Sequence, residues 1–226
     1  MLVTALFSCW EQMREMAEPA SKSYCLRPMS MDDMPTIARW FEHLADLCLF
    51  DRGCAMPVNE ATVSASWAEV LKGPEPAKAY WYALENDEGE VVAIIGLDNI
   101  NYIHGDAVIA IYVSNNLRQI GIGSRAMAMV IDMAFNQLRL NRLTSYLRED
   151  NLASQKLTQK VGFTQEGLMR QAWFAAGKHF DILSIGLLSS EWYEHRQALI
   201  DKLDDSVEIR LGRSPDSARK WPESLT

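Results

Sequence analysis

The sequence lacks the signatures of several common protein classes. Its four cysteines form no C-x-x-C pair, and its four histidines show no spacing typical of a zinc site. No run is apolar for long enough to span a bilayer, and the apolar first ten residues have neither the basic n-region nor the cleavage pattern of a signal peptide. We therefore expect no metal, no membrane partner, and free thiols in a cytoplasmic protein. The cysteines are Cys9, Cys25, Cys48 and Cys54.

Basic residues are in the minority. The chain of 226 residues has 22 lysines and arginines against 30 aspartates and glutamates, which gives a formal net charge of −8. This balance argues against direct nucleic-acid binding and is compatible with a cationic substrate. A hydrophobic content of 48% in a chain of this length fits one globular domain with terminal extensions.

One stretch combines a strand, a glycine turn and a helix. Residues 107–113 carry no charge and include several β-branched residues, as in a buried strand. The turn Arg118-Gln119-Ile120-Gly121-Ile122-Gly123 follows, and apolar residues then recur at helical spacing to Leu138. Alternate glycines and the unpaired N–H groups of a helix start favour a phosphate or pyrophosphate, although a tight packing loop has the same pattern. Neither the P-loop motif nor the third glycine of the dinucleotide fingerprint is present.

The rest of the chain predicts strands and helices in mixed order, without internal repeats. Residues 1–23 are interpreted as an extension that serves for docking or for a homodimer, and the tail is expected to be loose from Ser206 onward. The predicted strands are residues 24–28, 78–84, 91–97, 107–113, 142–148, 168–174 and 180–188. The predicted helices are residues 30–49, 60–71, 151–161 and one from 191 to about 203, besides the helix after the glycine turn.

Several separate motifs in this order resemble the GCN5-related N-acetyltransferase (GNAT) superfamily. They are Arg-x-x-Gly-x-Gly from Arg118, Asn-Leu-Ala-Ser from Asn151, and Gly-Phe-x-x-Glu-Gly from Gly162, with Gly177, Asp181 and Glu191-Trp192 beyond them. The likeness covers about residues 24–193 and is greatest to the branch of ribosomal-protein alanine and spermidine N-acetyltransferases. It implies a mixed α+β fold with a splayed sheet flanked by helices. The division is then 1–23 extension, 24–193 acetyltransferase domain, and 194–226 C-terminal helix and tail.

The resemblance also implies a cosubstrate. Acetyl-CoA is expected between the fourth and fifth strands, with its pyrophosphate on the glycine turn. Arg125 fits a pyrophosphate ligand and a solvated helix arginine equally well. Asn151 fits a residue bonded to the pantetheine arm or a plain helix cap, and we favour a mixed role. The implied acetyl-CoA-binding residues are Val113, Arg118, Gln119, Ile120, Gly121, Ile122, Gly123, Ser124, Asn151 and Ser154.

The superfamily's chemistry assigns roles to few side chains here. The backbone N–H near Val113 is expected to stabilise the oxyanion. Where relatives have a tyrosine as proton donor, this chain has Leu157-Thr158, so Ser154 is the candidate, against a purely local role in its helix. Tyr112 and Tyr146 are substitutes, although strand tyrosines more often serve packing.

The general base is less clearly marked. The position that holds a glutamate in the ribosomal branch is aligned here with Trp173, which cannot accept a proton. A water chain, Asp106, His104 or Asp181 are the alternatives. Asp181 matches an acidic position of the branch, and we favour a structural role for it in the hairpin.

The acceptor site is expected between the first two helices. Residues 50–60, with Trp67, Trp81 and Trp173, are predicted to shape a groove for an apolar or cationic amine, and core packing is preferred for Trp81. The acidic residues Asp46, Asp51 and Glu60 fit either an ammonium group or a solvated helix face. A protein N-terminus, a polyamine and an amino sugar all stay open as acceptors. The rival hypotheses are a non-catalytic acyl-CoA-binding module and a nucleotide-binding domain for ATP or NAD.

Overall fold

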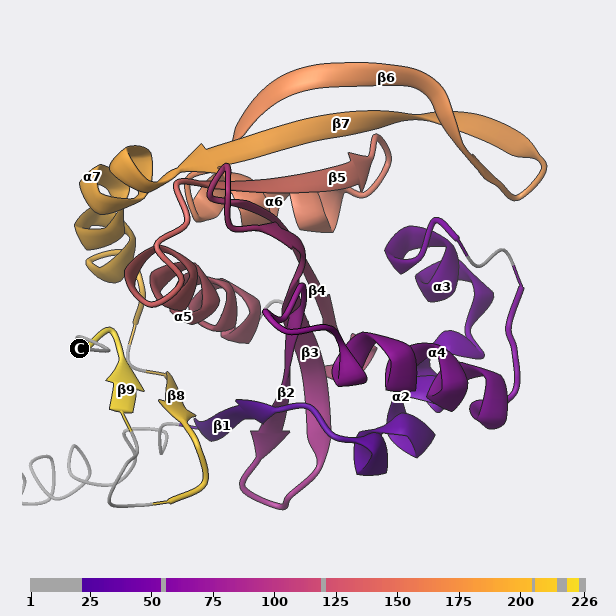
Figure 1. Cartoon of the computed structure of the whole chain (residues 1–226), viewed down its shortest axis with the longest axis horizontal. Coiled ribbons are helices and arrows are strands. Elements are labelled where there is room, and N and C mark those ends of the chain that lie inside the picture. The colour runs from indigo at the N-terminus through magenta and orange to yellow at the C-terminus, as the bar shows by residue number, and fades with distance from the viewer. Residues whose placement is uncertain (1–21, 54–55, 119–120, 205, 215–218, 224–226) are drawn as a thin grey trace, which may run out of the picture.

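The computed structural model describes residues 22–53, 56–118, 121–204, 206–214 and 219–223 (Figure 1). Nearly all of the N-terminal extension and the turn residues Gln119 and Ile120 lie outside these ranges. The described residues form a nine-stranded mixed sheet in the order β6-β7-β5-β4-β3-β2-β1-β8-β9. Helices pack against both of its faces (Figure 1), which confirms the predicted fold class.

The strands are β1 (Lys22–Pro28), β2 (Tyr80–Asn86), β3 (Val91–Asn101), β4 (Asp106–Val113), β5 (Arg142–Arg148), β6 (Thr164–Ala175), β7 (Lys178–Leu188), β8 (Val207–Leu211) and β9 (Arg219–Trp221). The helices are α2 (Met34–Phe41), α3 (Leu44–Phe50), α4 (Glu60–Lys72), α5 (Ile122–Asn136), α6 (Leu152–Lys160) and α7 (Ser189–Ile200), with the short 3₁₀ turns η1 (Met31–Asp33) and η2 (Asn115–Leu117).

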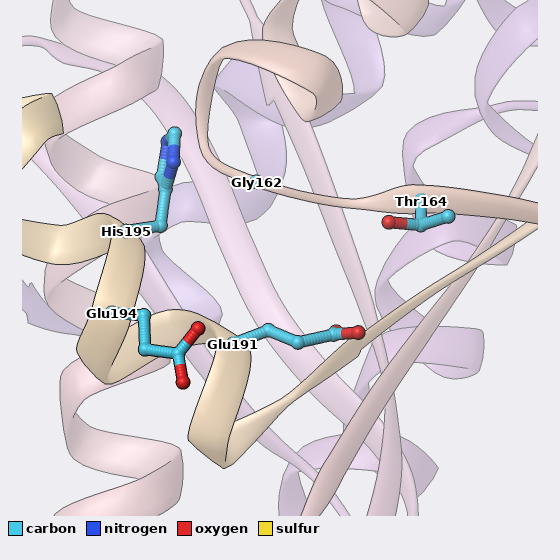
Figure 2. A pocket seen from close by; sticks show the side chains of 5 residues that line it. All are labelled: Gly162, Thr164, Glu191, Glu194 and His195. Atoms are coloured by element: carbon cyan, nitrogen blue, oxygen red, sulfur yellow. The ribbon is translucent and has the colours of Figure 1, made fainter.

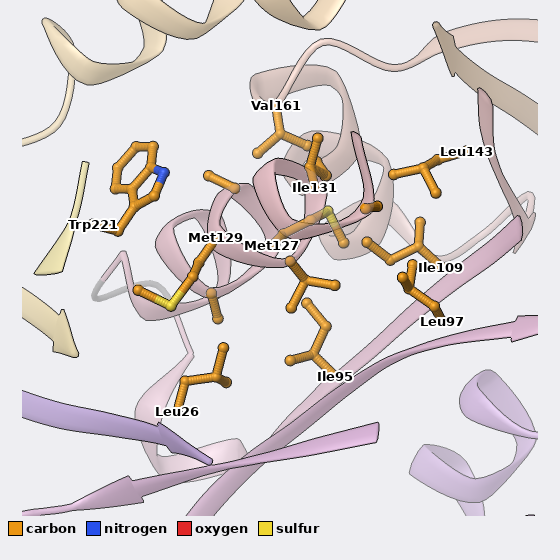
Figure 3. Packing of buried hydrophobic residues seen from close by; sticks show 14 of the residues in the cluster. Leu26, Ile95, Leu97, Ile109, Met127, Met129, Ile131, Leu143, Val161 and Trp221 are labelled. Carbon is orange, nitrogen blue, oxygen red and sulfur yellow. The ribbon is translucent and has the colours of Figure 1, made fainter. Parts of the chain in front are cut away.

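Side-chain alternation along β4 divides the core in two. Ala107 and Ile109 pack in the larger cluster around α5, whereas Ala110 and Tyr112 pack in a second cluster with α2, α3 and α4. Helix α5 is enclosed by the sheet on one side and by α7 and β9 on the other, so it is apolar nearly all round (Figure 3). Its fully buried methionines and Ile131 each stabilise the fold by about 1.5–3 kcal/mol.

The helix predicted for residues 30–49 is not continuous. It breaks at His43, whose backbone is extended with φ −80° and ψ 101°, and α3 starts afresh at Leu44. No proline or glycine marks this break in the sequence. The change of direction brings Asp46 of α3 against Tyr112, Asn115 and Arg118 at the end of β4, so tertiary contacts override local helix propensity here.

The expectation of a loose tail from Ser206 is wrong. β8 pairs in parallel with β1, from Lys22 opposite Val207 to Leu26 opposite Leu211, and β9 pairs with β8. Trp221 is only 6% exposed and packs on α5 (Figure 3). The alternation of Val207, Ile209 and Leu211 is the strand signal that marks this segment.

Asp132 joins the C-terminal segment to the core. Its buried carboxylate on α5 accepts hydrogen bonds from the indole N–H groups of Trp192 (2.7 Å) and Trp221 (3.0 Å), and it pairs with Arg196 at 2.9 Å. The donors come from α7 and β9, which are separate segments of the chain. One charge therefore satisfies three groups that would otherwise be costly to bury.

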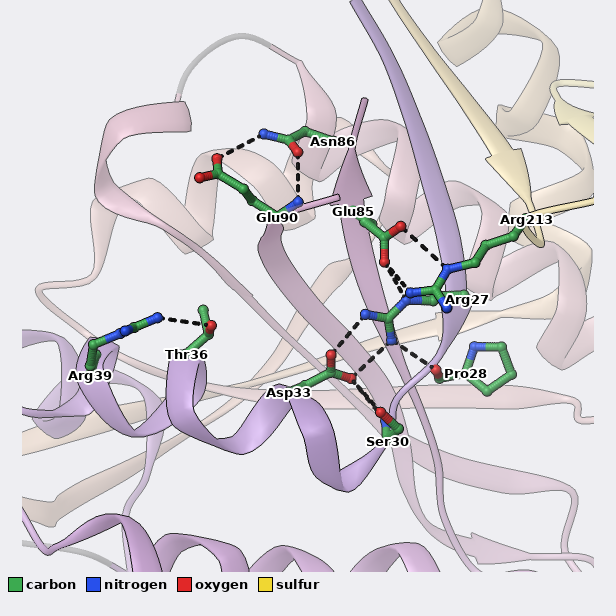
Figure 4. A network of polar contacts seen from close by, with 10 residues as sticks. All are labelled: Arg27, Pro28, Ser30, Asp33, Thr36, Arg39, Glu85, Asn86, Glu90 and Arg213. Atoms are coloured by element: carbon green, nitrogen blue, oxygen red, sulfur yellow. Dashed lines mark hydrogen bonds and ion pairs between the residues drawn. The ribbon is translucent and has the colours of Figure 1, made fainter. Parts of the chain in front are cut away.

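A second buried ion pair connects β1 to the turn before α2 and to β2 (Figure 4). Arg27 of β1 contacts both carboxylate oxygens of Asp33, at 2.9 and 2.7 Å, and contacts Glu85 of β2 at 2.6 Å. Burial alone would raise the pKa of Asp33, but hydrogen bonds from Arg27 and from Ser30 lower that pKa below its ordinary value. The pair therefore stabilises the fold only while Asp33 is ionised.

Asp33→Asn should lower the free energy of unfolding at pH 7 by about 1–3 kcal/mol, since Glu85 still pairs with Arg27. A carboxyl whose folded-state pKa is lowered contributes stability above its unfolded-state pKa, and that contribution is lost as the pH falls through the folded-state value. The difference in the free energy of unfolding between the wild type and Asp33→Asn should therefore shrink below about pH 4. Urea unfolding at pH 7 and pH 3 measures it, with the exposed neighbour variant Asp32→Asn as control. An equal difference at both pH values would contradict the assignment.

Candidate functional site

The strands β4 and β5 part in the middle of the sheet. They pair in parallel only from Asp106 opposite Arg142 to Val108 opposite Thr144. Residues 109–113 of β4 and 145–148 of β5 are not paired with each other, and the two strands diverge (Figure 1). We call these unpaired ends the fork. It leaves backbone groups of two neighbouring strands available to a ligand.

One backbone group at the fork has a defined direction. The N–H of Ser114 donates to Val92 on the β3 side at 2.9 Å. Because N–H and C=O directions alternate along a strand, the N–H and C=O of Val113 point to the opposite side, into the fork. The Val113 carbonyl there accepts a hydrogen bond from Arg118 Nε at 3.1 Å. The Val113 N–H is thus directed as an oxyanion donor requires.

The glycine turn lies at the open end of the fork. Gly121 caps α5 with φ +89°, in the left-handed region, and the first N–H groups of α5 follow it. A Cβ at Gly123 would lie 3.5 Å from Leu157 Cδ2 and 3.7 Å from Val113 Cγ2. The first turn of α5 therefore lies against the end of β4 and against Leu157 in the second half of α6. Ser124 and Ile122 are buried beside them.

The first turn of α6 behaves as the sequence indicates. The Asn151 side chain accepts from the Ser154 N–H at 3.1 Å and so caps the helix. Thr158, where relatives have tyrosine, is buried and donates its hydroxyl to the Ser154 carbonyl at 2.9 Å. Among the described residues no hydrogen bond involves the Ser154 hydroxyl, and Ser154 shares a helix face with Leu157. In the described structure the Ser154 hydroxyl is therefore available to bond a ligand, whereas the Thr158 hydroxyl is already used within the helix.

Arg118 is held by protein groups. Its guanidinium contacts Asp46 at 3.0 Å, and Asp46 also accepts from Asn115 at 2.7 Å and from the Tyr112 hydroxyl at 3.3 Å. Burial raises the pKa of Tyr112 to about 12, and the Asp46 charge adds to the shift. Tyr112 is thus tied into packing and into this ion pair. Tyr146, in contrast, is exposed on β5 at the fork.

Arg125 is not a solvated helix arginine. It is 5% exposed, its Nη1 donates to the Gly121 carbonyl at 3.3 Å, and its Nη2 bonds both the carbonyl and the carboxylate of Asp204. Asp204 precedes β8. The C-terminal segment is thereby linked to the glycine turn.

The alternative bases lie away from Val113 or have structural contacts. Asp106 is at the opposite end of the eight-residue β4, about 23 Å from Val113 at strand spacing, and His104 is in the exposed turn before it. Asp181 accepts from the Gln171 N–H at 2.8 Å, which fixes the bulge of β6. This contact fits the structural interpretation of Asp181, and its catalytic role stays a prediction.

Trp173 does not line the expected acceptor groove. It is 6% exposed in a small cluster with Ala175, Phe180, Ile182 and the partly buried Cys48. The β6 bulge between Met169 and Trp173, with Gln171 at φ 52°, shifts the register of β6 against β7. Trp173 therefore serves packing between the hairpin and α3.

A cavity of about 580 Å³ lies on the face of the sheet opposite α5. We call it the aromatic cavity. Trp81 lies directly over Gly96, where any Cβ would overlap its indole, and its ring meets Trp67 edge to face at 4.8 Å. Among the described lining residues are Phe41, Phe50, Asp51, Trp67, Trp81, Asp98 and Ala110. Trp81, for which core packing was preferred, thus both packs and lines the cavity.

Sequence reasoning missed Asp98. It follows the apolar run of β3 and has no helical or motif context.

A second hollow, lined by Gly162, Thr164, Glu191, Glu194 and His195, lies beside α7 (Figure 2). There Glu191 caps α7 by accepting from the Leu188 N–H, and His195 bonds the Lys160 carbonyl, so both have structural contacts.

The family follows from a match that covers more than half of the chain, including the fork and the glycine turn. The family model described as "Acetyltransferase (GNAT) domain" matches residues 24–164, from β1 to the start of β6. The chain belongs to the GNAT acetyltransferase family. The resemblance drawn from the Arg118, Asn151 and Gly162 motifs is therefore confirmed.

Curated relatives in this family agree with the predicted branch. The putative ribosomal N-acetyltransferase YdaF of Bacillus subtilis (strain 168) is 29% identical over 105 residues, which cover 46% of this chain and 57% of that protein. The spermidine N(1)-acetyltransferase of Escherichia coli (strain K12) is 23% identical over 196 residues, covering 79% and 93%. The chain thus spans little more than half the length of the first relatives it matches.

Solved GNAT structures share the fold. The crystal structure of spermidine N-acetyltransferase from Vibrio cholerae in complex with CoA and spermine superposes with a TM-score of 0.68 at 17% identity, over 75% of this chain and 98% of that one. In the described part of this chain, no helix is both long and apolar enough to cross a membrane. The described residues also contain no cluster of three or more His, Cys, Asp or Glu that could hold a metal ion.

Proposed function

We propose that the protein transfers an acetyl group from acetyl-CoA to a primary amine. The observation that carries this proposal is the fork. At its open end it combines the inward N–H of Val113 with the N-terminus of α5, and the aromatic cavity reaches the same strand through Ala110 from the other face of the sheet. Donor and acceptor would therefore approach β4 from opposite faces.

The residues then have separate tasks. The turn from Gly121 to Ser124 would hold the pyrophosphate through backbone N–H groups at the positive end of the α5 dipole. The Val113 N–H would donate to the thioester oxygen as negative charge develops on it. A neutral amine attacks the thioester carbon, and the C–S bond breaks as the C–N bond forms. Ser154 would give a proton to the departing thiolate, while the proton lost by the nitrogen passes to water, from which the Ser154 hydroxyl is restored. Binding both substrates in one orientation supplies much of the rate.

The acceptor is proposed to be a protein N-terminus or a polyamine. The net charge of −8 and the two carboxylates of the aromatic cavity support a cationic amine. The printed names of the relatives include both a ribosomal and a spermidine N-acetyltransferase. A homodimer and a cytoplasmic location stay predictions.

The direct test is thiol release from acetyl-CoA in the presence of a panel of amines, with mass spectrometry of the products. Turnover on at least one amine supports the proposal. Tight CoA binding without turnover on any amine would instead favour a non-catalytic acyl-CoA-binding module, which the loss of the family tyrosine at Thr158 makes the specific alternative. Thermal protection by ATP or NAD but not by CoA would contradict both.

Ser154→Ala should lower kcat by about a hundredfold or more and leave the Kd for acetyl-CoA unchanged, because it removes the proposed proton donor without altering the Asn151 cap, which uses the backbone N–H. Single-turnover thiol release and calorimetry measure the two quantities. Ser154→Thr, which keeps a hydroxyl, should retain more activity. Unchanged turnover in Ser154→Ala would remove Ser154 from the mechanism.

A further inference from the structure

The aromatic cavity has the charge and walls of a cation site. Asp51 and Asp98 line it, and no lysine, arginine or histidine is among its described lining residues. The rings of Trp67, Trp81 and Phe50 line its wall. Phe50 and Trp81 meet edge to face, with their ring centroids 6.3 Å apart. Aromatic faces attract cations most strongly where water is excluded. A volume of about 580 Å³ is enough for a small organic ligand.

Asp98 differs from the buried carboxylates elsewhere in the described structure. Asp33, Asp46 and Asp132 are each paired with an arginine. Asp98 is half-buried, and in the described structure its hydrogen-bond donor is the neutral indole N–H of Trp81, at 3.3 Å. Burial raises the pKa of Asp98 above its ordinary value, against the effect of that hydrogen bond. A carboxylate in this state gains most from an incoming cation.

The position of Asp98 relative to β4 indicates which amino group of the acceptor it would bind. Asp98 of β3 lies opposite Val108, where the pairing of β4 with β5 ends, and Ala110 of β4 lines the same cavity. The amine that attacks at the fork must be neutral, so it cannot be the group that a carboxylate retains as an ammonium ion. A second nitrogen on the same molecule can stay protonated in the cavity.

We propose that Asp98, which lines the aromatic cavity beside Trp81, binds a second ammonium group of the acceptor and so sets a preference for amines with two nitrogens over monoamines. This inference rests on the proposed acetyl transfer and adds the residue that selects the acceptor. Asp51 contributes less, because it is exposed and its Oδ1 already accepts from the Gly53 N–H at 2.7 Å. Asp98 is a specificity residue here and takes no part in proton transfer.

The test compares 1,8-diaminooctane with octylamine, which share one carbon chain and differ by one ammonium group; the chain is long because Asp98 lies opposite Val108, five residues along β4 from Val113. In Asp98→Asn, which keeps the hydrogen bond to Trp81, kcat/KM for 1,8-diaminooctane should fall about tenfold or more while kcat/KM for octylamine stays within about twofold. Asp87→Asn, an exposed aspartate in the β2–β3 turn, is the matched control and should leave both unchanged. An unchanged ratio of the two amines in Asp98→Asn would overturn the proposal.

Calorimetry without acetyl-CoA separates this inference from the proposed function. 1,8-Diaminooctane should bind the wild-type chain at least about tenfold more tightly than it binds Asp98→Asn, whether or not acetyl transfer occurs. If no amine is acetylated but this difference is found, the cation site stands and the transferase proposal fails. If amines are acetylated but 1,8-diaminooctane binds both chains equally, the transferase stands and the Asp98 site fails.

Discussion

Gly121→Glu should weaken the binding of acetyl-CoA by at least about a hundredfold. Gly121 has φ +89°, which costs a residue with a Cβ about 1–2 kcal/mol, and its Cβ would lie 2.5 Å from Arg125 Nη1. The new carboxylate would also stand at the helix start proposed for the pyrophosphate, where it repels a like charge. Calorimetric titration with CoA, at the same protein concentration as for the wild type, measures the loss.

Two variants make the result specific. Gly89→Glu places the same side chain at φ +81° in an exposed turn with nothing within 4 Å of the Cβ, so it has the backbone strain without the site. It should bind CoA as the wild type does. In Gly121→Asn the new residue tolerates a left-handed φ and adds no charge, so this variant should lose less affinity for CoA than Gly121→Glu. Wild-type affinity in Gly121→Glu would show that the pyrophosphate lies elsewhere.

Asp132→Ala should lower the free energy of unfolding by about 3–5 kcal/mol. The carboxylate is 2% exposed, and its removal leaves Arg196 and the buried indole N–H groups of Trp192 and Trp221 without their acceptor. Urea unfolding followed by circular dichroism gives the value. The loss is expected in the whole fold, because Asp132 joins α5, α7 and β9.

Graded variants test this assignment. Trp221→Phe removes one donor and replaces the indole with a smaller phenyl ring, so it should cost about 1 kcal/mol through the hydrogen bond, plus a packing loss. Asp87→Ala, at an exposed turn, should change stability by less than about 0.5 kcal/mol. A loss in Asp132→Ala no greater than in Trp221→Phe would mean that the carboxylate is not the shared acceptor that the geometry indicates.

The local structure at the proposed cosubstrate end of the site was predictable because its signals are local. A glycine with positive φ before a helix, and an asparagine that caps the next helix, are each determined by residues within a few positions. The order of strands around them then followed from the family motifs. The fork itself was implied by the resemblance, since its opening depends on where two strands stop pairing.

The acceptor end was harder to predict because its geometry is non-local. The break at His43 depends on contacts that Asp46 makes with the end of β4, and the direction of Trp173 depends on a bulge in β6. Asp98 becomes notable only when β2, α3 and α4 surround it. The spacing of residues along the sequence does not indicate that elements far apart in the chain will surround Asp98.

The parallel pairing of β1 with β8 has a consequence for biosynthesis. β1 is among the earliest described residues to leave the ribosome, yet its partner Val207–Leu211 is translated after every helix of the described fold. Until then, the edge of β1 away from β2 is an unpaired template, open to other chains. The sheet would therefore be completed only when β8 pairs with β1, and a premature stop before Val207 should yield an aggregating product rather than a smaller stable one.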